Sequence, residues 1–289
     1  MVNSGLRALP VSIIPHGVDT QHFHPLRQER GLQASSENRR TARDKLFAGH
    51  PGLRDSFIVL NANRNQPRKR LDITMEAFAM FAQDKPKNVK LYLHMAREDS
   101  GWDIQLLAQR LNITDRLLVT TLHNGLPNLS LEHLNLIYNA CDVGVNTASA
   151  EGWGLVSFEH AATGAPQIVP RHTSPAELWE NAAVMVDPSF TLTNERILTR
   201  AYYVAPRDVA AALQRLYSDQ SYYGTLAEAA FRKATLRHYD WDVIAGQWDR
   251  IFTVLHATRS GQDLQERIPS SNELSNLSRK EHSNELALL

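Results

Sequence analysis

The sequence of 289 residues has one cysteine, Cys141, so no disulfide can form within the chain. It has no excess of either charge: 31 Lys and Arg balance 31 Asp and Glu, so no global field favours nucleic acid or an anionic membrane. No secretory signal opens the chain, and the apolar runs are far shorter than the roughly 20 residues of a membrane span. We therefore expect a cytoplasmic protein with no transmembrane segment, which does not bind nucleic acid and buries Cys141 in its core.

Short apolar runs recur along the first two thirds of the chain. They cover residues 57–62, 90–95, 117–120, 142–146, 167–170 and 183–186. Their spacing leaves room for a helix between successive strands, and they hardly alternate with polar residues, as is typical of strands covered on both faces. The pattern predicts an α/β fold, a Rossmann-like doubly wound parallel sheet that ends by about residue 190, with trailing C-terminal helices after Pro206.

Capping residues mark several of the expected helices. Asp103 and Ser130 precede helical stretches and are expected to cap them. Ser174 and Glu177, with proline between them, have the spacing of a capping box. By contrast, residues 27–45 hold six cations and few apolar residues, which indicates a mobile connection leading into a short helix.

Two loops are unusual among those that follow the apolar runs, where ligands bind in open parallel sheets. Residues 61–70 carry Arg64, Arg68, Lys69 and Arg70 with no acid among them. The cluster is either a solvated basic loop or an anion site. Its expected place at the carboxyl edge favours an anion site, where the cations would bind a diphosphate and stabilise the charge of a departing one.

The second loop, residues 147–159, combines glycines with two glutamates. Gly152 and Gly154 allow a tight turn into a helix, whose first amides favour an anion. Glu151 and Glu159 can each accept two hydrogen bonds from vicinal sugar hydroxyls. The alternative is that Glu151 caps a turn and Glu159 covers a helix face. A phosphate site flanked by two carboxylates suggests a nucleotide sugar.

These residues resemble a known family. The stretch from Glu151 to Glu159 is similar to the E-x7-E motif of retaining GT-B glycosyltransferases of family 4. The resemblance covers residues 11–257. Other segments that resemble the family, in its order, are Ile14 to Asp19 with Phe23 and Pro25, Arg64 and Lys69 before Asp72, Leu136 to Val143, and His160 to Pro166.

The resemblance implies roles for particular residues. Arg64 and Lys69 would bind the donor diphosphate and offset leaving-group charge without a metal. Glu151 would contact the transferred hexose, and Glu159 the ribose hydroxyls. Further donor contacts would come from Gly152, Trp153, Gly154 and Leu155, and from the loop between His123 and Leu129, which would line the base pocket. Trp153 departs from the phenylalanine that is commonest at its position.

The implied activity is transfer of a hexose from a nucleotide-diphosphate sugar, with retention of configuration, to an unknown glycan, lipid or protein acceptor. No cofactor is implied beyond this donor substrate. Family members have two Rossmann-like domains, and this chain resembles the second, donor-binding domain of a GT-B fold. Residues 1–26 would be the link from the acceptor domain, 27–257 the donor domain and 258–289 a polar, disordered tail. A separate acceptor-domain subunit is thus a possible partner.

Other functions remain as alternatives. The chain would be a non-catalytic nucleotide-sugar-binding or interaction module if it binds a donor or a partner but transfers nothing. Gly152 and Gly154 match the first two glycines of a dinucleotide-binding fingerprint, but Ser157 stands where the third glycine would be. A glycosidase could use Glu151 and Glu159 as its carboxylate pair, but that leaves the cations unexplained. Asp240 and Asp242 have a metal-diphosphate pattern, but their place before a helix favours capping.

Overall fold

The computed structural model describes residues 12–26, 32–96, 99–120, 129–194 and 198–257, and the side chains of 32–35 are not described. The chain forms two compact units. One consists of Met1–Asp19 with Thr235–Leu289, and the other of Thr20–Ala234. The predicted tail at 258–289 lies outside the described residues.

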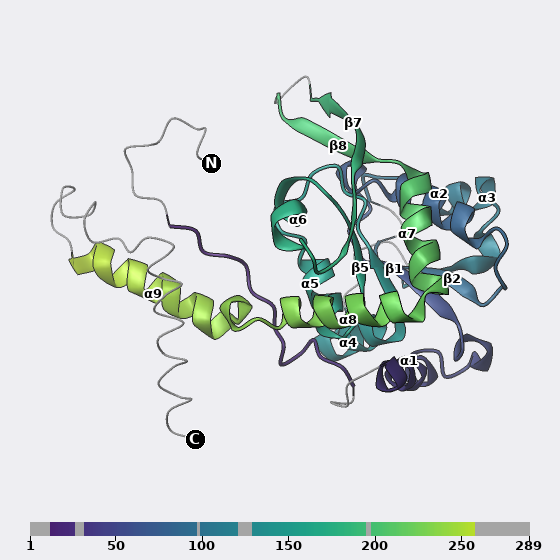
Figure 1. The fold of residues 1–289 in the computed structure, drawn as a ribbon, viewed down its shortest axis with the longest axis horizontal. Helices are drawn as coiled ribbons and strands as arrows, with labels where there is room; N and C mark the ends of the chain where they lie inside the picture. Colours follow the sequence, from purple (N-terminus) through teal and green to yellow (C-terminus); the bar gives the residue numbers. More distant parts are fainter. Residues whose placement is uncertain (1–11, 27–31, 97–98, 121–128, 195–197, 258–289) are drawn as a thin grey trace. The chain divides into compact units, whose positions relative to one another are not determined.

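The larger unit alternates helices and strands as the sequence predicts (Figure 1). Its strands are β1 (Phe57–Asn61), β2 (Val89–Leu93), β3 (Leu117–Val119), β4 (Val143–Val145), β5 (Gln167–Pro170), β6 (Val184–Val186), β7 (Pro188–Thr193) and β8 (Arg200–Val204). Its α-helices are α1 (Leu32–Leu46), α2 (Leu71–Ala82), α3 (Ile104–Arg110), α4 (Leu131–Ala140), α5 (Leu155–Ala162), α6 (Thr173–Leu178), α7 (Pro206–Ser218) and α8 (Gln220–Ala234). Single 3-10 turns, η1 (Pro51–Leu53), η2 (Pro67–Lys69) and η3 (Thr114–Arg116), complete the described elements of this unit.

A six-stranded sheet forms the centre of this unit. Its strand order is β3-β2-β1-β4-β5-β6, and every neighbouring pair is parallel. The sheet and its flanking helices confirm the predicted α/β, Rossmann-like fold. All six strands lie at the six predicted apolar runs.

The two faces of the sheet carry separate helices because alternate side chains of a strand point to opposite faces. Val59, Leu91 and Val143 pack in one apolar cluster with Phe78 of α2 and Leu213 of α7. Figure 1 shows α2, α3 and α7 on this side, with α4 and α5 on the other. Burial on both faces explains why the runs hardly alternate.

Strands β7 and β8 form a second, antiparallel sheet that the sequence analysis did not predict. The parallel sheet itself ends at Val186, as predicted, and this separate hairpin continues strand structure as far as Val204. The hairpin follows β6 and therefore leaves the carboxyl edge of the main sheet (Figure 1). Its residues are mostly half-exposed or exposed, so it lacks the continuous apolar run that marked the buried strands.

Helix ends follow the sequence in two cases and depart from it in a third. Asp103 accepts from the amides of Gln105 and Leu106, and Ser130 accepts from that of His133, as predicted. The expected capping box at Ser174 is wrong, because α6 begins at Thr173 and the Ser174 hydroxyl bonds to Glu151 instead.

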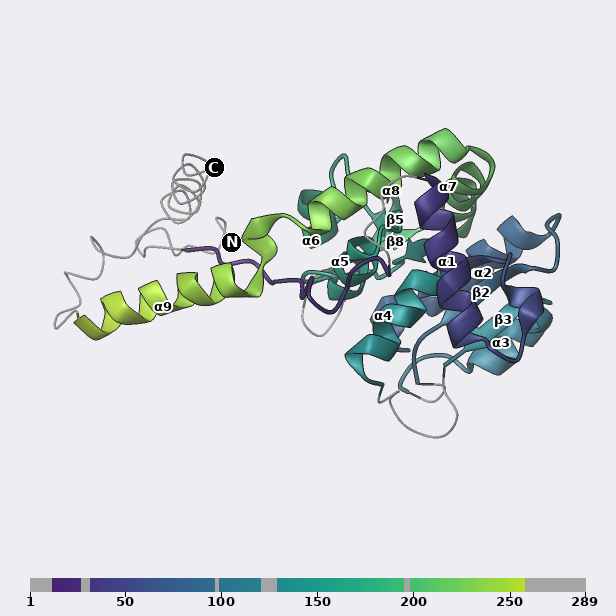
Figure 2. The same cartoon turned by 90° about the horizontal axis from the view of Figure 1, so that it is seen from below.

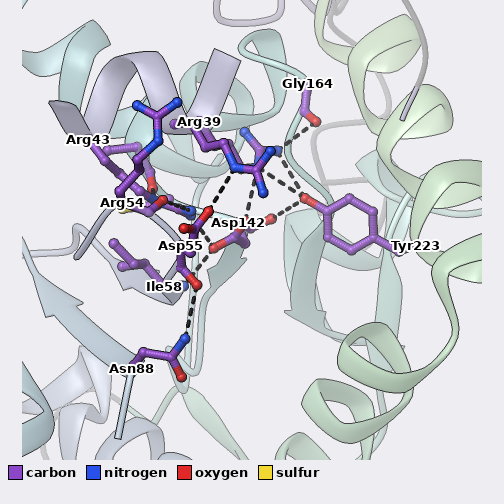
Figure 3. A network of polar contacts seen from close by, with 12 residues as sticks. Arg39, Arg43, Arg54, Asp55, Ile58, Asn88, Asp142, Gly164 and Tyr223 are labelled. Carbon is purple, nitrogen blue, oxygen red and sulfur yellow. Dashed lines mark hydrogen bonds and ion pairs between the residues drawn. The ribbon is translucent and has the colours of Figure 1, made fainter. Parts of the chain in front are cut away.

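Helix α1 extends for 15 residues, so the predicted mobile connection with a short helix is wrong over the described part of the segment. Arg39 and Arg43 of α1 are buried, and both meet Asp142 at the start of β4 (Figure 3). Figure 2, seen from below, shows α1 beside α4. The cations that indicated a solvated segment therefore anchor a helix.

Among the residues that the structure describes, Asp142 is the only acid that pairs with the two buried guanidinium groups. Its Oδ1 lies 3.3 Å from Arg39 Nε, and its Oδ2 accepts from Arg43 and, at 2.6 Å, from the Ile58 amide. The Tyr223 hydroxyl accepts from Arg39 and donates to the Asp142 carbonyl, which ties α8 to the same place (Figure 3). A buried charge is stable only when it is paired and hydrogen-bonded.

The smaller unit brings residues 12–19 against a helical segment, with η4 (Arg237–Tyr239) leading into α9 (Trp241–Ala257). The Val18 amide donates to the Tyr239 carbonyl at 2.8 Å. Gly17 packs on the Trp241 ring, and a Cβ there would lie 2.5 Å from a ring carbon, so no larger residue fits. Asp240 accepts from the Asp242 amide, as expected of a capping residue.

Replacing Asp142 tests the buried ionic network. Asp142→Asn keeps the shape but leaves two buried guanidinium groups without an anion, so we expect a loss of about 3–5 kcal/mol in the free energy of unfolding. Asp55→Asn is the matched control, because the exposed Asp55 carboxylate pairs with Arg40 at the surface, where such pairs contribute under about 1 kcal/mol. Urea denaturation measures both, and equal losses would contradict the assigned role of Asp142.

Candidate functional site

The site lies where the strand order reverses. After β1 the chain builds β2 and β3 on one side, and it then returns to place β4 on the other side of β1. In open parallel sheets, ligands bind outside the carboxyl ends of the strands at such a reversal. The two unusual loops, residues 61–70 and 147–159, follow these two strands.

A ladder of asparagines shapes the loop after β1. Asn61 ends the strand, and its side-chain oxygen accepts from the amide and the side chain of Asn63 at 3.0 and 3.1 Å. Asn63 then accepts from Lys69 Nζ at 2.9 Å. All three side chains are buried, and each bond satisfies a polar group removed from water. The ladder therefore fixes the Lys69 ammonium over the end of β1.

Threonine and serine join this loop to the loop after β4. The Thr147 hydroxyl lies 2.7 Å from the Thr74 hydroxyl and donates to the Arg70 carbonyl at 2.9 Å. The Ser149 amide donates to the Arg68 carbonyl at 2.7 Å. These bonds connect the two loops and fix the distance between them.

Lys69 and Glu151 form an ion pair at the centre of the site. Lys69 Nζ donates to Glu151 Oε2, and both side chains are about nine-tenths buried. Burial lowers the pKa of Lys69, and the Glu151 carboxylate acts against this by favouring the charged ammonium. Arg68 Nη1 lies 3.9 Å from Glu151 Oε1, so a second cation faces the same carboxylate.

Arg64 lies at the same edge but pairs with a different acid. Its Nη2 is 3.1 Å from Asp99 Oδ2, and its Nε donates to the same oxygen at 3.2 Å. Asp99 follows β2 and also accepts from the Ser100 amide. Each cation of the loop thus has an acid partner in space, although none is present among residues 61–70. These acids come from the segment after β2, the loop after β4 and α2.

The turn from β4 into α5 depends on one glycine. Gly154 has φ 89° and ψ 51°, in the left-handed region that residues with a Cβ rarely adopt, and it immediately precedes α5. Trp153 does not extend freely, because its ring stacks on Phe158 with centroids 5.3 Å apart. Leu155 opens the helix and is exposed, as is Gly152. The turn thus presents main chain and Leu155 rather than the indole.

Glu159 lies one turn into α5 and faces α4. Its Oε2 accepts from the Tyr138 hydroxyl at 2.8 Å. Burial raises the pKa of the Glu159 carboxyl, and the hydrogen bond from Tyr138 partly opposes this. Spacing of four residues puts Glu159 on the same helix face as Leu155, the first residue of α5.

A second polar cluster lies at the ends of β2 and β3. His94 Nδ1 is 2.8 Å from the Thr120 hydroxyl, which donates to the Tyr92 hydroxyl at 2.8 Å. Burial, helped by the nearby His133, lowers the pKa of His94 to about 4, so the ring is neutral at pH 7. The predicted base-pocket residue Leu129 precedes α4 and is half-buried, whereas His123 lies outside the described residues.

The structure joins some predicted site residues and separates others. Lys69 and Glu151 touch, whereas Arg64 and Glu159 have their own partners, Asp99 and Tyr138. Sequence reasoning missed polar residues that follow strands: Asn63, Asp99, Thr173 and Ser174. The rule that selected the loops after β1 and β4 applies equally to the ends of β2 and β5, and it would have drawn attention to Asp99, Thr173 and Ser174.

Within the described ranges, no group of three or more His, Cys, Asp or Glu side chains could hold a metal ion. Among the helices that the structure describes, none is long and apolar enough to cross a membrane.

Comparisons with known sequences find glycosyltransferases. No protein-family model matches the chain. The D-inositol 3-phosphate glycosyltransferase of Geodermatophilus obscurus is 30% identical over 157 residues, which make up 54% of this chain and 32% of that relative. The match therefore spans about a third of the length of the relative.

Comparisons with solved structures confirm the fold. Sucrose-phosphate synthase from Thermosynechococcus elongatus superposes with a TM-score of 0.63 at 23% identity, over 84% of this chain and 52% of that one. Anabaena HepE in complex with UDP and glucose superposes with a TM-score of 0.59 at 17% identity, over 84% of this chain and 56% of that one. The C-terminal domain of a group 1 glycosyl transferase from Francisella tularensis superposes with a TM-score of 0.54 at 17% identity, over 77% of this chain and 98% of that one. The chain therefore has the fold of these solved structures, and it spans about half of the first two and nearly all of the third.

The raised pKa of Glu159 has a consequence for stability. Folding disfavours its charged form, so the carboxylate destabilises the protein at pH values above its folded pKa. Glu159→Gln stays neutral and can still accept from Tyr138. We therefore expect this variant to melt at or a few degrees above the wild-type temperature near pH 8, with the difference vanishing by about pH 4.

Glu132→Gln provides a control of opposite sign. Hydrogen bonds from its own amide and from Ser130 lower the pKa of Glu132, so its carboxylate stabilises the fold above its unfolded pKa. Glu132→Gln should therefore melt slightly below wild type near pH 8. Melting curves recorded across this pH range test both signs, and a Glu159→Gln deficit that grows with pH would contradict the assignment.

Proposed function

We propose that the chain binds a nucleotide-diphosphate sugar and transfers its hexose with retention of configuration, as the second, donor-binding half of a retaining GT-B glycosyltransferase of family 4. The observation that carries the proposal is the buried pair of Lys69 and Glu151, held between the loops of β1 and β4 at the reversal of strand order. A crevice there accepts a nucleotide in folds of this class. A cation and a carboxylate side by side match a donor that carries both phosphate and hydroxyl groups.

The cations would act on the leaving group. In the proposed transfer, an acceptor hydroxyl oxygen bonds to the anomeric carbon as the bond from that carbon to the diphosphate oxygen breaks, with its electrons leaving on the diphosphate. The acceptor proton passes to the departing phosphate on the same face. Lys69 and Arg64 would stabilise the charge that develops, without a metal or other cofactor.

The carboxylates would hold the sugars of the donor. Glu151 would contact the transferred hexose beside Lys69, and Glu159 would accept from the ribose hydroxyls. The contact between Glu159 and Tyr138 supports the second role, because the Tyr138 hydroxyl orients the carboxylate through Oε2 and does not use Oε1. Gly152, Gly154 and Leu155 would offer main-chain amides at the start of α5.

The named relatives support a transferase acting on a nucleotide sugar, since one solved neighbour holds UDP and glucose. Because this chain spans only about a third to a half of these proteins, the acceptor site is proposed to lie in a second domain or a partner subunit. The acceptor itself would be a glycan, lipid or protein. We propose a cytoplasmic location on the same resemblance.

Donor binding is tested by calorimetric titration with UDP-, GDP- and ADP-sugars. We expect one of them to saturate wild type, and Lys69→Ala or Glu159→Ala to weaken it about 10- to 100-fold, as for the loss of a charge-assisted hydrogen bond. Lys87→Ala is the control, because Lys87 is an exposed cation next to the amino end of β2. No saturable binding, or equal affinity in all variants, would refute the donor site.

Turnover separates an enzyme from a binding module. Release of free nucleotide that depends on an added acceptor and on Glu151 supports the transferase, and we expect EDTA to leave its rate unchanged. Donor binding with no release, even with an acceptor domain supplied, would favour the non-catalytic module.

The ion pair between Arg64 and Asp99 predicts a gain of affinity. Asp99 holds Arg64 in an ion pair and would place a negative charge near the proposed diphosphate. Asp99→Asn keeps the shape and the bond to the Ser100 amide, so UDP should bind about three- to tenfold more tightly, which corresponds to roughly 1 kcal/mol. Asp115→Asn, which frees the exposed Lys87 instead, should change nothing. Weaker binding to Asp99→Asn would show that this pair supports the site.

A further inference from the structure

The main chain of Glu151 is held on both sides by one turn. Its amide donates to the Thr173 hydroxyl at 3.3 Å, and its carbonyl accepts from the Ser174 hydroxyl at 2.9 Å. Thr173 and Ser174 begin α6, which follows β5, the strand next to β4. The hydroxyls of two consecutive residues, Thr173 and Ser174, thus bond to the amide and the carbonyl of Glu151, more than 20 residues earlier in the chain.

The conformation of Thr173 is strained. Its φ is 45°, in the left-handed region, where a β-branched residue is a rare outlier. Thr173 is also exposed, so packing in the core does not explain this conformation. Strain of this kind persists where the surroundings determine it, and it concentrates at functional sites. In this conformation the Thr173 hydroxyl accepts from the Glu151 amide and also lies 3.1 Å from His172 Nδ1.

The same turn is braced from the hairpin. The ring of His172 stacks on that of Tyr202 in β8, with centroids 4.9 Å apart and planes 14° from parallel. The Tyr202 amide donates to the Ser149 carbonyl at 2.8 Å, two residues before Glu151. The hairpin therefore contacts both the turn and the loop that the turn holds.

A glutamate in a loop needs such support if its carboxylate is to occupy one place. Residues 146–154 lie outside the helices and strands, so the Glu151 main chain depends on bonds to neighbouring segments for its position. A displacement of about 1 Å at a reacting centre lowers rates by up to about 100-fold. Rigid neighbours that fix the backbone therefore matter as much as the group itself.

We propose that Thr173 and Ser174 are positioning residues, which fix the Glu151 carboxylate against Lys69 by clamping the Glu151 main chain. The bonds of the Thr173 and Ser174 hydroxyls to the Glu151 main chain carry this proposal. Its consequence for turnover rests on the proposed function.

Isosteric and conservative variants test the clamp. Thr173→Val and Ser174→Ala each remove one hydroxyl, Thr173→Ser keeps the acceptor, and Thr225→Val removes an exposed hydroxyl bond on α8 as the control. We expect Thr173→Val and Ser174→Ala to lower donor turnover about 10-fold or more while the donor Kd changes less than about threefold, because Arg64 and Glu159 are untouched. Thr173→Ser and Thr225→Val should match wild type.

A second measurement does not depend on turnover. The pKa of Lys69, followed by NMR of its side-chain carbon and nitrogen, reports the distance of Glu151, since that carboxylate favours the ammonium form. Loss of either clamp hydroxyl should lower this pKa further, and Thr173→Ser should restore it. A merely structural role for the turn would leave the pKa of Lys69 unchanged.

The outcomes separate the two proposals. If wild type neither binds nor turns over any donor, the proposed function fails, and the Lys69 titration alone decides the clamp. An unchanged Lys69 pKa in both Thr173→Val and Ser174→Ala overturns it. Loss of cooperative folding in both variants would show that the hydroxyls serve stability, and it would overturn the positioning role as well.

Discussion

The site depends on the adjacency of β1 and β4. Because the strand order reverses between them, a lysine from one loop and a glutamate from the other meet in a place that neither loop could enclose alone. Neither charge is stable there without the other, since an unpaired buried ion is strongly disfavoured. The asparagine ladder and the hydroxyl bonds of Thr147 and Ser149 extend the same constraint into the backbone.

One strand carries a charge at each of its ends. Asp142 precedes β4 and accepts from two buried arginines of α1, while Glu151 follows β4 and meets Lys69. The amino-edge network holds α1 and α8 to the sheet, and the carboxyl-edge pair forms the candidate site. A short strand of three residues, Val143–Val145, is thereby fixed along its axis by ionic contacts at both edges.

The predicted and unpredicted parts of the structure differ in a physical way. Strands buried on both faces have continuous apolar runs, so the sequence predicted β1 to β6. The half-exposed β7–β8 hairpin has no such run and was not predicted. Arg39 and Arg43 looked like solvated charges because their acid is about 100 residues away. Ser174 looked like a cap because a hydroxyl can satisfy an amide of its own helix or, as here, a carbonyl elsewhere.

The sequence by itself determined the class of fold, the order of the strands along the chain and the two loops that hold the candidate site residues. These features depend on the pattern of neighbouring residues, which is local. Tertiary structure alone decided which charges pair. Lys69 pairs with Glu151, and Arg64 pairs with Asp99. Thr173 and Ser174 form hydrogen bonds with the Glu151 main chain. Such pairings depend on distances between the ends of different strands, and those distances exist only after the sheet has formed.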